Sequence, residues 1–88
     1  MNEPQELIEF PCHFPIKVMG LKHPDFAPTI AEVIKQFDPT FDVKSITTRD
    51  SAKGNYQGLN VVVHTTSREH LDNIYRALTS HPMVKVVL

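Results

Sequence analysis

Residues 56–65, YQGLNVVVHT, decide the fold because they alternate between two kinds of side chain. Leu59, Val61 and Val63 fall on one face of an extended chain, and a mixed set of side chains falls on the other. An alternation with a period of two residues predicts a strand with one buried face and one open face. The segments on either side of this strand must therefore supply the layer that covers its apolar face.

A helix is predicted directly after this strand. Thr66 and Glu69 have the spacing of a capping box, in which each side chain accepts a hydrogen bond from the backbone N–H of the other residue. Apolar residues then recur at helical spacing until Ser80-His81-Pro82 ends the pattern. This apolar stripe consists of Leu71, Ile74, Tyr75 and Leu78.

A second strand and a second helix are predicted upstream. Residues 14–19, FPIKVM, also alternate, and we expect Gly20 to end this strand; Pro15 removes one backbone donor near its start. Asp25 is expected to be the N-cap of a helix that stops at Asp38-Pro39. The apolar stripe of that helix consists of Phe26, Ile30, Val33, Ile34 and Phe37.

Two shorter strands complete the pattern. Residues 41–48 are rich in β-formers but polar on balance, which favours an edge strand. A turn at 51–55 follows, in which Gly54 and Asn55 are expected to take positive φ, and residues 83–88 form the last, apolar strand. The order βαββαβ predicts an α+β fold: a ferredoxin-like two-layer sandwich with a four-stranded antiparallel sheet and two helices on one face.

Length and composition predict one small domain. The chain has 88 residues and a formal charge of −1, so we expect an N-terminal arm over 1–13 and a single ferredoxin-like domain over 14–88. Cys12 is the single cysteine, which rules out an internal disulfide. The polar, acidic start resembles neither a signal peptide nor a membrane span, so we expect a cytoplasmic protein without membrane contact.

Nucleic-acid binding is not expected, because an RNA-recognition sheet carries aromatic side chains on its two central strands. Tyr56 alone is aromatic among the residues predicted to face outward there, and the charge balance provides no basic field. The other outward positions are Lys17, Met19, Gly58, Asn60, Val62 and His64. A weak nucleic-acid-binding module is therefore the third of the functions considered.

Metal binding and catalysis are also not expected. The five histidines show neither the i,i+4 helical spacing nor the close loop spacing of metal sites, so we predict no metal and no cofactor. An enzyme would have to use His64 or His70 with Asp72 or Glu69. This small enzyme with a His/carboxylate site remains the alternative to a non-enzymatic domain.

Four strings of the sequence occur together in a known family. The strings are Leu7-Ile8-Glu9-Phe10-Pro11, Phe14-x-x-Lys17-Val18-Met19-Gly20, Ser51-x-Lys53-Gly54-Asn55-Tyr56 and Val84-x-x-Val87-Leu88. With these strings in this order, the chain resembles the YbeD-like family of small uncharacterised bacterial proteins. Gly58 departs from the family pattern, which usually has serine two residues after the tyrosine.

The resemblance implies a βαββαβ fold similar to ACT-type regulatory domains, which bind small metabolites and control enzymes. Genes of the family often lie near those for lipoate attachment, which implies a link to lipoate metabolism. No catalytic residue is implied, and the residues expected to contact a ligand or partner come from two of the strings. They are Lys17, Met19, Gly20, Lys53, Gly54, Asn55 and Tyr56.

The expected function is therefore a non-enzymatic regulatory or adaptor domain that binds a small metabolite or a protein partner. An open sheet face with Met19, Val62 and Val87 exposed among polar groups supports this expectation. Residues 83–88 offer an apolar sheet edge, and the N-terminal arm is a candidate to cover it. We expect a monomer in weak exchange with a dimer.

Overall fold

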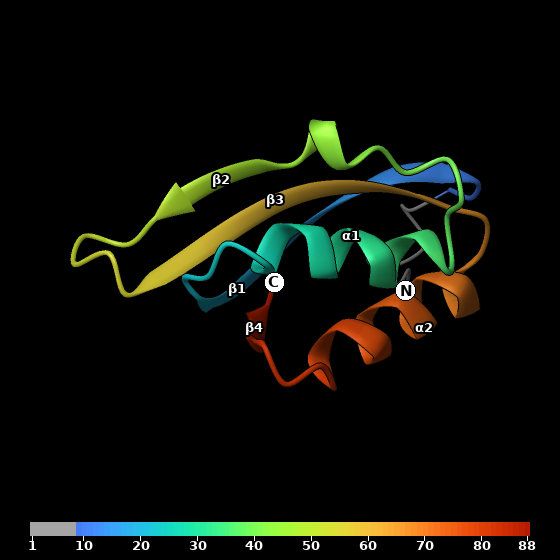
Figure 1. The fold of residues 1–88 in the computed structure, drawn as a ribbon. Helices are drawn as coiled ribbons and strands as arrows, with labels where there is room; N and C mark the ends of the chain where they lie inside the picture. The colour runs from blue at the N-terminus through green and yellow to red at the C-terminus, as the bar shows by residue number, and fades with distance from the viewer. Residues whose placement is uncertain (1–8) are drawn as a thin grey trace.

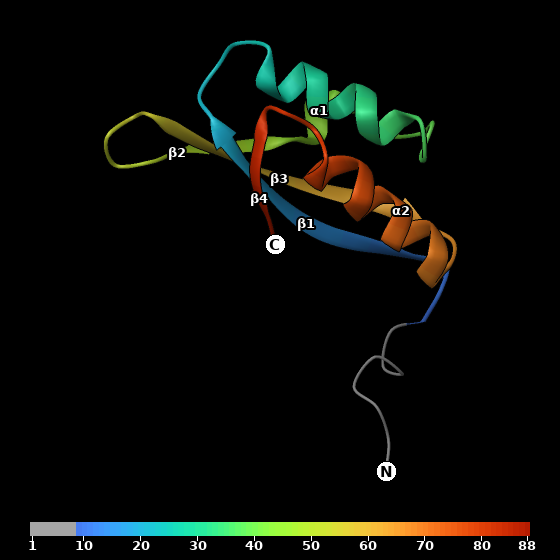
Figure 2. The same ribbon diagram turned by 90° about the horizontal axis from the view of Figure 1, so that it is seen from below.

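The computed structural model describes residues 9–88 and shows two layers, a sheet and a pair of helices on one of its faces (Figures 1 and 2). The strands lie in the order β2-β3-β1-β4, and every neighbouring pair is antiparallel. The elements are β1 (Cys12–Leu21), α1 (Phe26–Lys35), the 3-10 turn η2 (Val43–Ser45), β2 (Thr47–Asp50), β3 (Tyr56–Thr65), α2 (Arg68–Thr79) and β4 (Val84–Val87). The predicted fold class is confirmed. Expectations for Leu7 and Ile8 lie outside the described residues.

The core lies between the sheet and the helices, as the two periodicities predict. Alternate residues of β1 and β3 meet the apolar stripes of α1 and α2, and almost all of these side chains are fully buried. The buried apolar residues are Ile16, Val18, Phe26, Ile30, Ala31, Ile34, Phe41, Leu59, Val61, Val63, Leu71, Ile74 and Leu78. No element of residues 9–88 covers the opposite face of the sheet, and the candidate site lies on this face.

β1 is longer than predicted at both ends. It begins at Cys12, so it takes in the last two residues of the predicted arm, and it continues through Gly20 to Leu21. Gly20 therefore does not end the strand. A Cβ atom there would overlap the carbonyl oxygen of Met83 and the ring of Phe26, so glycine allows β4 and α1 to approach β1 closely.

Pro15 removes no bond between β1 and β3. The Lys17 N–H donates to Leu88 O at 3.1 Å, so it points toward β4 and away from β3. The backbone nitrogen of Pro15, two residues earlier, points to the same side of β1, and β4 does not extend as far as Pro15. The proline therefore occupies a position where an N–H would have no strand partner among residues 9–88.

The caps of the two long helices agree only in part with the predictions. Asp25 is the N-cap residue of α1, as predicted, but its side chain makes no capping bond; its backbone N–H instead donates to His23 Nδ1 at 3.0 Å. The N-cap of α2 is Ser67 and not Thr66, since the Ser67 Oγ accepts from the His70 N–H at 3.1 Å. Sequence spacing alone did not distinguish two adjacent hydroxyl residues.

His70 replaces the predicted Glu69 as the second member of the cap. Its Nδ1 accepts a hydrogen bond from the Thr66 N–H at 3.1 Å, so the ring proton lies on Nε2, which donates to Phe37 O at 2.8 Å. The second bond joins the start of α2 to the chain just after α1. His70 is therefore a structural residue that uses both ring nitrogens.

The predicted strand at 41–48 is wrong for most of its length. Phe41 is buried in the core, Asp42 caps the turn η2 through a bond from the Lys44 N–H, and β2 begins only at Thr47. In the hairpin that follows, Gly54 has a φ of 73°, but no residue other than glycine has positive φ among those described. The positive φ predicted for Asn55 is therefore wrong.

Asp38 fastens the loop after α1 to β3. It is only 5% exposed, and it accepts bonds from the Thr40 hydroxyl at 2.6 Å, the Thr40 N–H at 3.1 Å and the His64 N–H at 3.0 Å. β2 pairs with β3 only as far as Asn60, so the His64 N–H has no strand partner on that side within the described part of the chain. Burial raises the pKa of the carboxyl, but the hydrogen bonds outweigh it and hold the pKa below 3.8.

We expect Asp38→Ala to lower the free energy of unfolding by about 2 kcal/mol near neutral pH, because several donors lose a charged acceptor. The folded-state pKa lies below the ordinary value of 3.8, so this contribution is complete above that pH and is lost as pH falls through the folded pKa. Urea titrations of both proteins from neutral to acidic pH should show the gap narrowing in acid. A gap of constant size would contradict this account.

Candidate binding site on the open face of the sheet

The open face is built from cross-strand rows of side chains. Met19 of β1 lies opposite Gly58 of β3, which lies opposite Arg49 of β2; the next row contains Lys17, Asn60 and Thr47. Lys17 and Met19 belong to non-hydrogen-bonded pairs with β3, because the Lys17 N–H points toward β4. Side chains in such pairs stand closer together than in hydrogen-bonded pairs.

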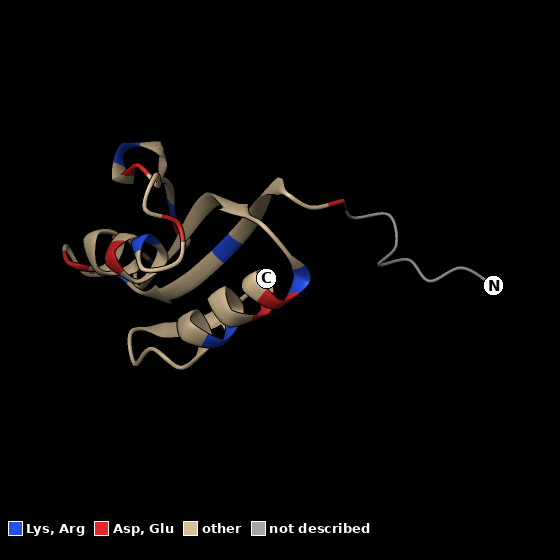
Figure 3. Ribbon diagram, turned by 90° about the vertical axis from the view of Figure 1, so that its right-hand side faces the viewer, with Lys and Arg blue, Asp and Glu red and all other residues tan. Residues whose placement is uncertain are grey.

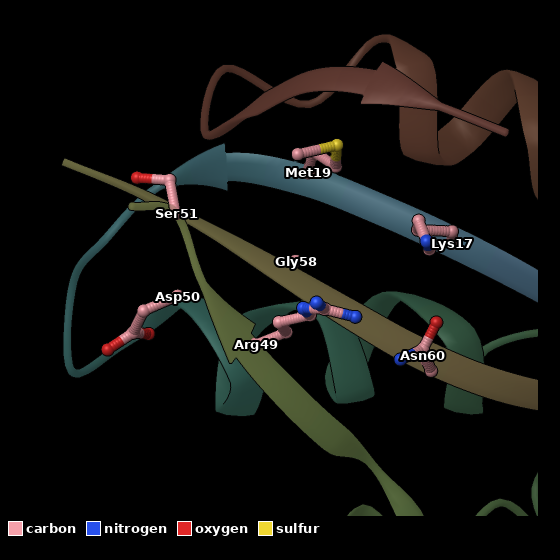
Figure 4. A pocket seen from close by; sticks show the side chains of 7 residues that line it. All are labelled: Lys17, Met19, Arg49, Asp50, Ser51, Gly58 and Asn60. Carbon is pink, nitrogen blue, oxygen red and sulfur yellow. The ribbon is translucent and has the colours of Figure 1, made fainter. Parts of the chain in front are cut away.

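A hollow of about 280 Å³ lies over Gly58, where the row of large side chains is interrupted (Figure 4). A Cβ at this position would stand 3.7 Å from Arg49 O and 4.0 Å from Met19 Cγ, so the space is open and the glycine is not required for packing. The hollow is lined by Lys17, Met19, Arg49, Asp50, Ser51, Gly58 and Asn60. Its walls combine two cations, an amide, a hydroxyl and a thioether.

The charge of the hollow is positive. No carboxylate within residues 9–88 forms an ion pair with Lys17 or Arg49. Asp50 lines the rim, but its carboxylate points away from Arg49 (Figure 4) and bonds to Lys22 Nζ at 2.6 Å and to Gln57 Nε2 at 3.2 Å. The bond from Lys22 is the main cause that lowers the pKa of Asp50. The carboxylate is thus ionised and directed to another cation.

The structure brings together only part of the predicted site. Lys17 and Met19 line the hollow, whereas Gly20 faces the core and contacts the neighbouring layers. Lys53, Gly54 and Asn55 lie in the loop between β2 and β3, and Tyr56 begins β3; none of these four lines the hollow. The prediction missed the other lining residues, which are Arg49, Asp50, Ser51, Gly58 and Asn60. Arg49 lies across Gly58 from Met19, and this place depends on the register between β2 and β3.

One apolar residue at the margin of the face was also assigned wrongly. Val86 pairs with Met19 and is exposed, whereas Val87 packs against the core. The register between β1 and β4 shifts between Met19 and Gly20, and this irregularity reverses the expected alternation in β4. β4 does lie at a sheet edge, as predicted. The weak monomer–dimer exchange stays a prediction.

Among residues 9–88, neither histidine considered for catalysis forms a side-chain hydrogen bond or an ion pair with Glu69 or Asp72. His70 uses both ring nitrogens in the fold, and Asp72 lies 3.8 Å from Arg68 on α2. Within residues 9–88 no group of three or more His, Cys, Asp and Glu side chains is placed to hold a metal ion. In the view of Figure 3, Lys/Arg and Asp/Glu are interspersed along the described part of the ribbon. No helix in the described part of the chain is long and apolar enough to cross a bilayer.

Fold and site together define a small ferredoxin-like α+β domain with an open, cation-lined sheet face. The model of the family described as "Protein of unknown function (DUF493)" matches residues 5–88, and the chain belongs to this family of small bacterial proteins. The resemblance to YbeD-like proteins is thereby confirmed.

Relatives are similar over nearly their whole length. The chain is 64% identical over 84 residues to a "UPF0250 protein" of Paraburkholderia phymatum, which covers 96% of this chain and 94% of the relative. It is 56% identical over 82 residues to a "UPF0250 protein" of Neisseria gonorrhoeae, which covers 93% of this chain and 90% of the relative. Among solved structures, protein HP0495 from H. pylori has a TM-score of 0.72 at 13% identity and covers 100% of this chain and 97% of that one. That likeness supports the fold alone.

Proposed function

We propose that this protein is a non-enzymatic binding domain whose open sheet face takes up the carboxylate of a small apolar acid. The observation that carries the proposal is the hollow over Gly58, which places the Lys17 and Arg49 cations beside a gap in the sheet surface. An Arg guanidinium and a Lys ammonium are strong donors to a carboxylate. The Asn60 side chain adds a neutral donor at the same place.

An apolar acid fits this site better than a highly charged ligand. Met19 forms part of the floor, and exposed Val86 and Val62 border the same face. A Met side chain adapts to varied apolar shapes, and a volume of about 280 Å³ suits a small metabolite. Amino acids and lipoyl-type acids combine one carboxylate with an apolar chain, and the family resemblance brings lipoyl-type acids forward.

Regulation is the use that we propose for this binding. A ligand held by both Lys17 and Arg49 would join a central strand to the edge strand β2, all four residues of which are exposed. Ligand binding would therefore stabilise the β2 edge and the surface presented there to a partner enzyme. A Glu or Asp side chain of a protein partner offers the same carboxylate chemistry, and the test below separates the two sources.

The proposal is tested by titrating the purified protein with lipoic acid, octanoic acid and apolar amino acids, and by following the melting temperature. We expect at least one acid to raise the melting temperature and the corresponding amide to leave the melting temperature unchanged. Lys17→Gln and Arg49→Gln should each weaken binding by about tenfold or more, because each removes a charge-assisted hydrogen bond.

Lys53→Gln is the matched control, since this lysine lies in the hairpin loop outside the hollow. It should leave the affinity unchanged. Equal loss in all three variants would show a general charge effect and would count against a defined site. Retention of a partner protein that depends on Lys17 and Arg49, with no response to any acid, would favour the protein carboxylate as the ligand.

A further inference from the structure

We infer that His13 and His64 form a two-histidine site for a late first-row divalent metal such as Zn²⁺ on the same sheet face. The two residues lie directly opposite each other in the ladder between β1 and β3, and their ring centres are 5.1 Å apart. The two histidines lie on different strands and are far apart in the chain, so their spacing in the sequence does not indicate that they form a pair. This inference does not depend on the proposed acid-binding function.

The backbone holds the two rings close. The His64 N–H donates to Asp38 Oδ2 at 3.0 Å, so it points away from β1. His13 and His64 are therefore a non-hydrogen-bonded pair, the kind in which opposite side chains approach most closely. Asp38 is nearly buried and fixes this end of β3, so the second ligand stands on a rigid support.

The spacing of the rings suits metal coordination. With Zn–N bonds of about 2.0–2.1 Å and a tetrahedral angle, two imidazoles on one ion have ring centres roughly 5 Å apart. The rings here are tilted by 58° and do not stack in parallel. Imidazole nitrogen is a good ligand for Zn²⁺, Cu²⁺ and Ni²⁺. The ring of His13 is exposed, so water can complete the coordination shell.

The site is separate from the hollow over Gly58. Pro15 and Val62 form the row between it and the row of Lys17 and Asn60. His13 and Lys17 are four residues apart along β1, which corresponds to about 13 Å. Cys12 is next to His13 in the chain but pairs with buried Thr65, so it lies on the core face and not beside the two rings.

The test is a Zn²⁺ titration of the untagged protein. Binding is measured by calorimetry, and the NMR signals of the ring protons are recorded for the five histidines. We expect saturation at one Zn²⁺ per chain below about 1 mM. The signals of His13 and His64 should shift first. His13→Ala and His64→Ala should each weaken binding by roughly tenfold or more, since losing even an outer-shell partner of a ligand costs 10–100-fold.

His23→Ala is the matched control, because His23 is an exposed histidine in the loop between β1 and α1. It should leave the affinity unchanged, and so should Cys12→Ser. His13→Ala removes an exposed side chain and keeps the result interpretable if His64→Ala fails to fold. No saturable binding, or binding lost with Cys12→Ser but kept in His13→Ala, would overturn the inference.

Discussion

Gly20→Ala is expected to lower the free energy of unfolding by about 3 kcal/mol, the upper end of the range for overpacking a core. The added methyl group would overlap the Met83 carbonyl oxygen and the Phe26 ring. A ring can move, but the carbonyl belongs to the backbone that leads into β4, so relief requires β4 to shift away from β1. Urea denaturation followed by circular dichroism, which needs no tryptophan, should show a lower midpoint with an unchanged dependence of the unfolding free energy on urea concentration.

Gly58→Ala is the matched control in the neighbouring strand. Its methyl group would have ordinary contacts at 3.7 and 4.0 Å, and replacing glycine within a strand should stabilise the protein by about 0.5 kcal/mol. Opposite signs for the two substitutions are therefore predicted. If both variants unfolded at the same urea concentration, the close approach of β4 at Gly20 would be refuted.

His70→Ala is the second large effect, with an expected loss of about 2–3 kcal/mol. The substitution leaves the Thr66 N–H without its acceptor at the start of α2 and the Phe37 carbonyl without its donor. It also removes the only side-chain bond that joins Phe37 to α2 among the hydrogen bonds of residues 9–88. Hydrogen exchange should speed up most at the start of α2 and in the loop after α1.

Glu69→Ala separates the predicted cap from the observed one. A capping box with Glu69 would make this substitution the costly one and leave His70→Ala mild. In the structure the Glu69 side chain is exposed and forms no hydrogen bond with another described residue, so its loss should cost only a few tenths of a kcal/mol through the helix dipole. A larger loss in Glu69→Ala than in His70→Ala would contradict the assignment of the cap.

The fold could be predicted because its main signals are local. Alternation in β1 and β3 and the apolar stripes of the helices each follow from residues within one element. The segment at 41–48 was misassigned for the opposite reason. Phe41 is buried by contacts with distant parts of the chain, and Asp42 then directs the backbone into a turn, so tertiary packing overrides β propensity there.

The candidate site could be predicted only where it lies on one strand. Lys17 and Met19 follow from the alternation of β1, whereas Arg49 joins them only because β2 pairs with β3 in one register. His13 and His64 are a second example, since their meeting depends on how β1 and β3 align. Register is set by hairpin geometry and by the core as a whole, which a single sequence does not specify residue by residue.

The central claim, that the open face of the sheet binds a carboxylate, is tested most directly by mapping amide chemical shifts during titration with the acid that raises the melting temperature. We predict that the largest shifts fall at the residues lining the hollow, in β1, β2 and β3, and that they disappear in the double variant Lys17→Gln, Arg49→Gln. The same titration should leave the amides of α1 and α2 nearly unchanged. Shifts that cluster on the helical face, or that persist in the double variant, would contradict the account.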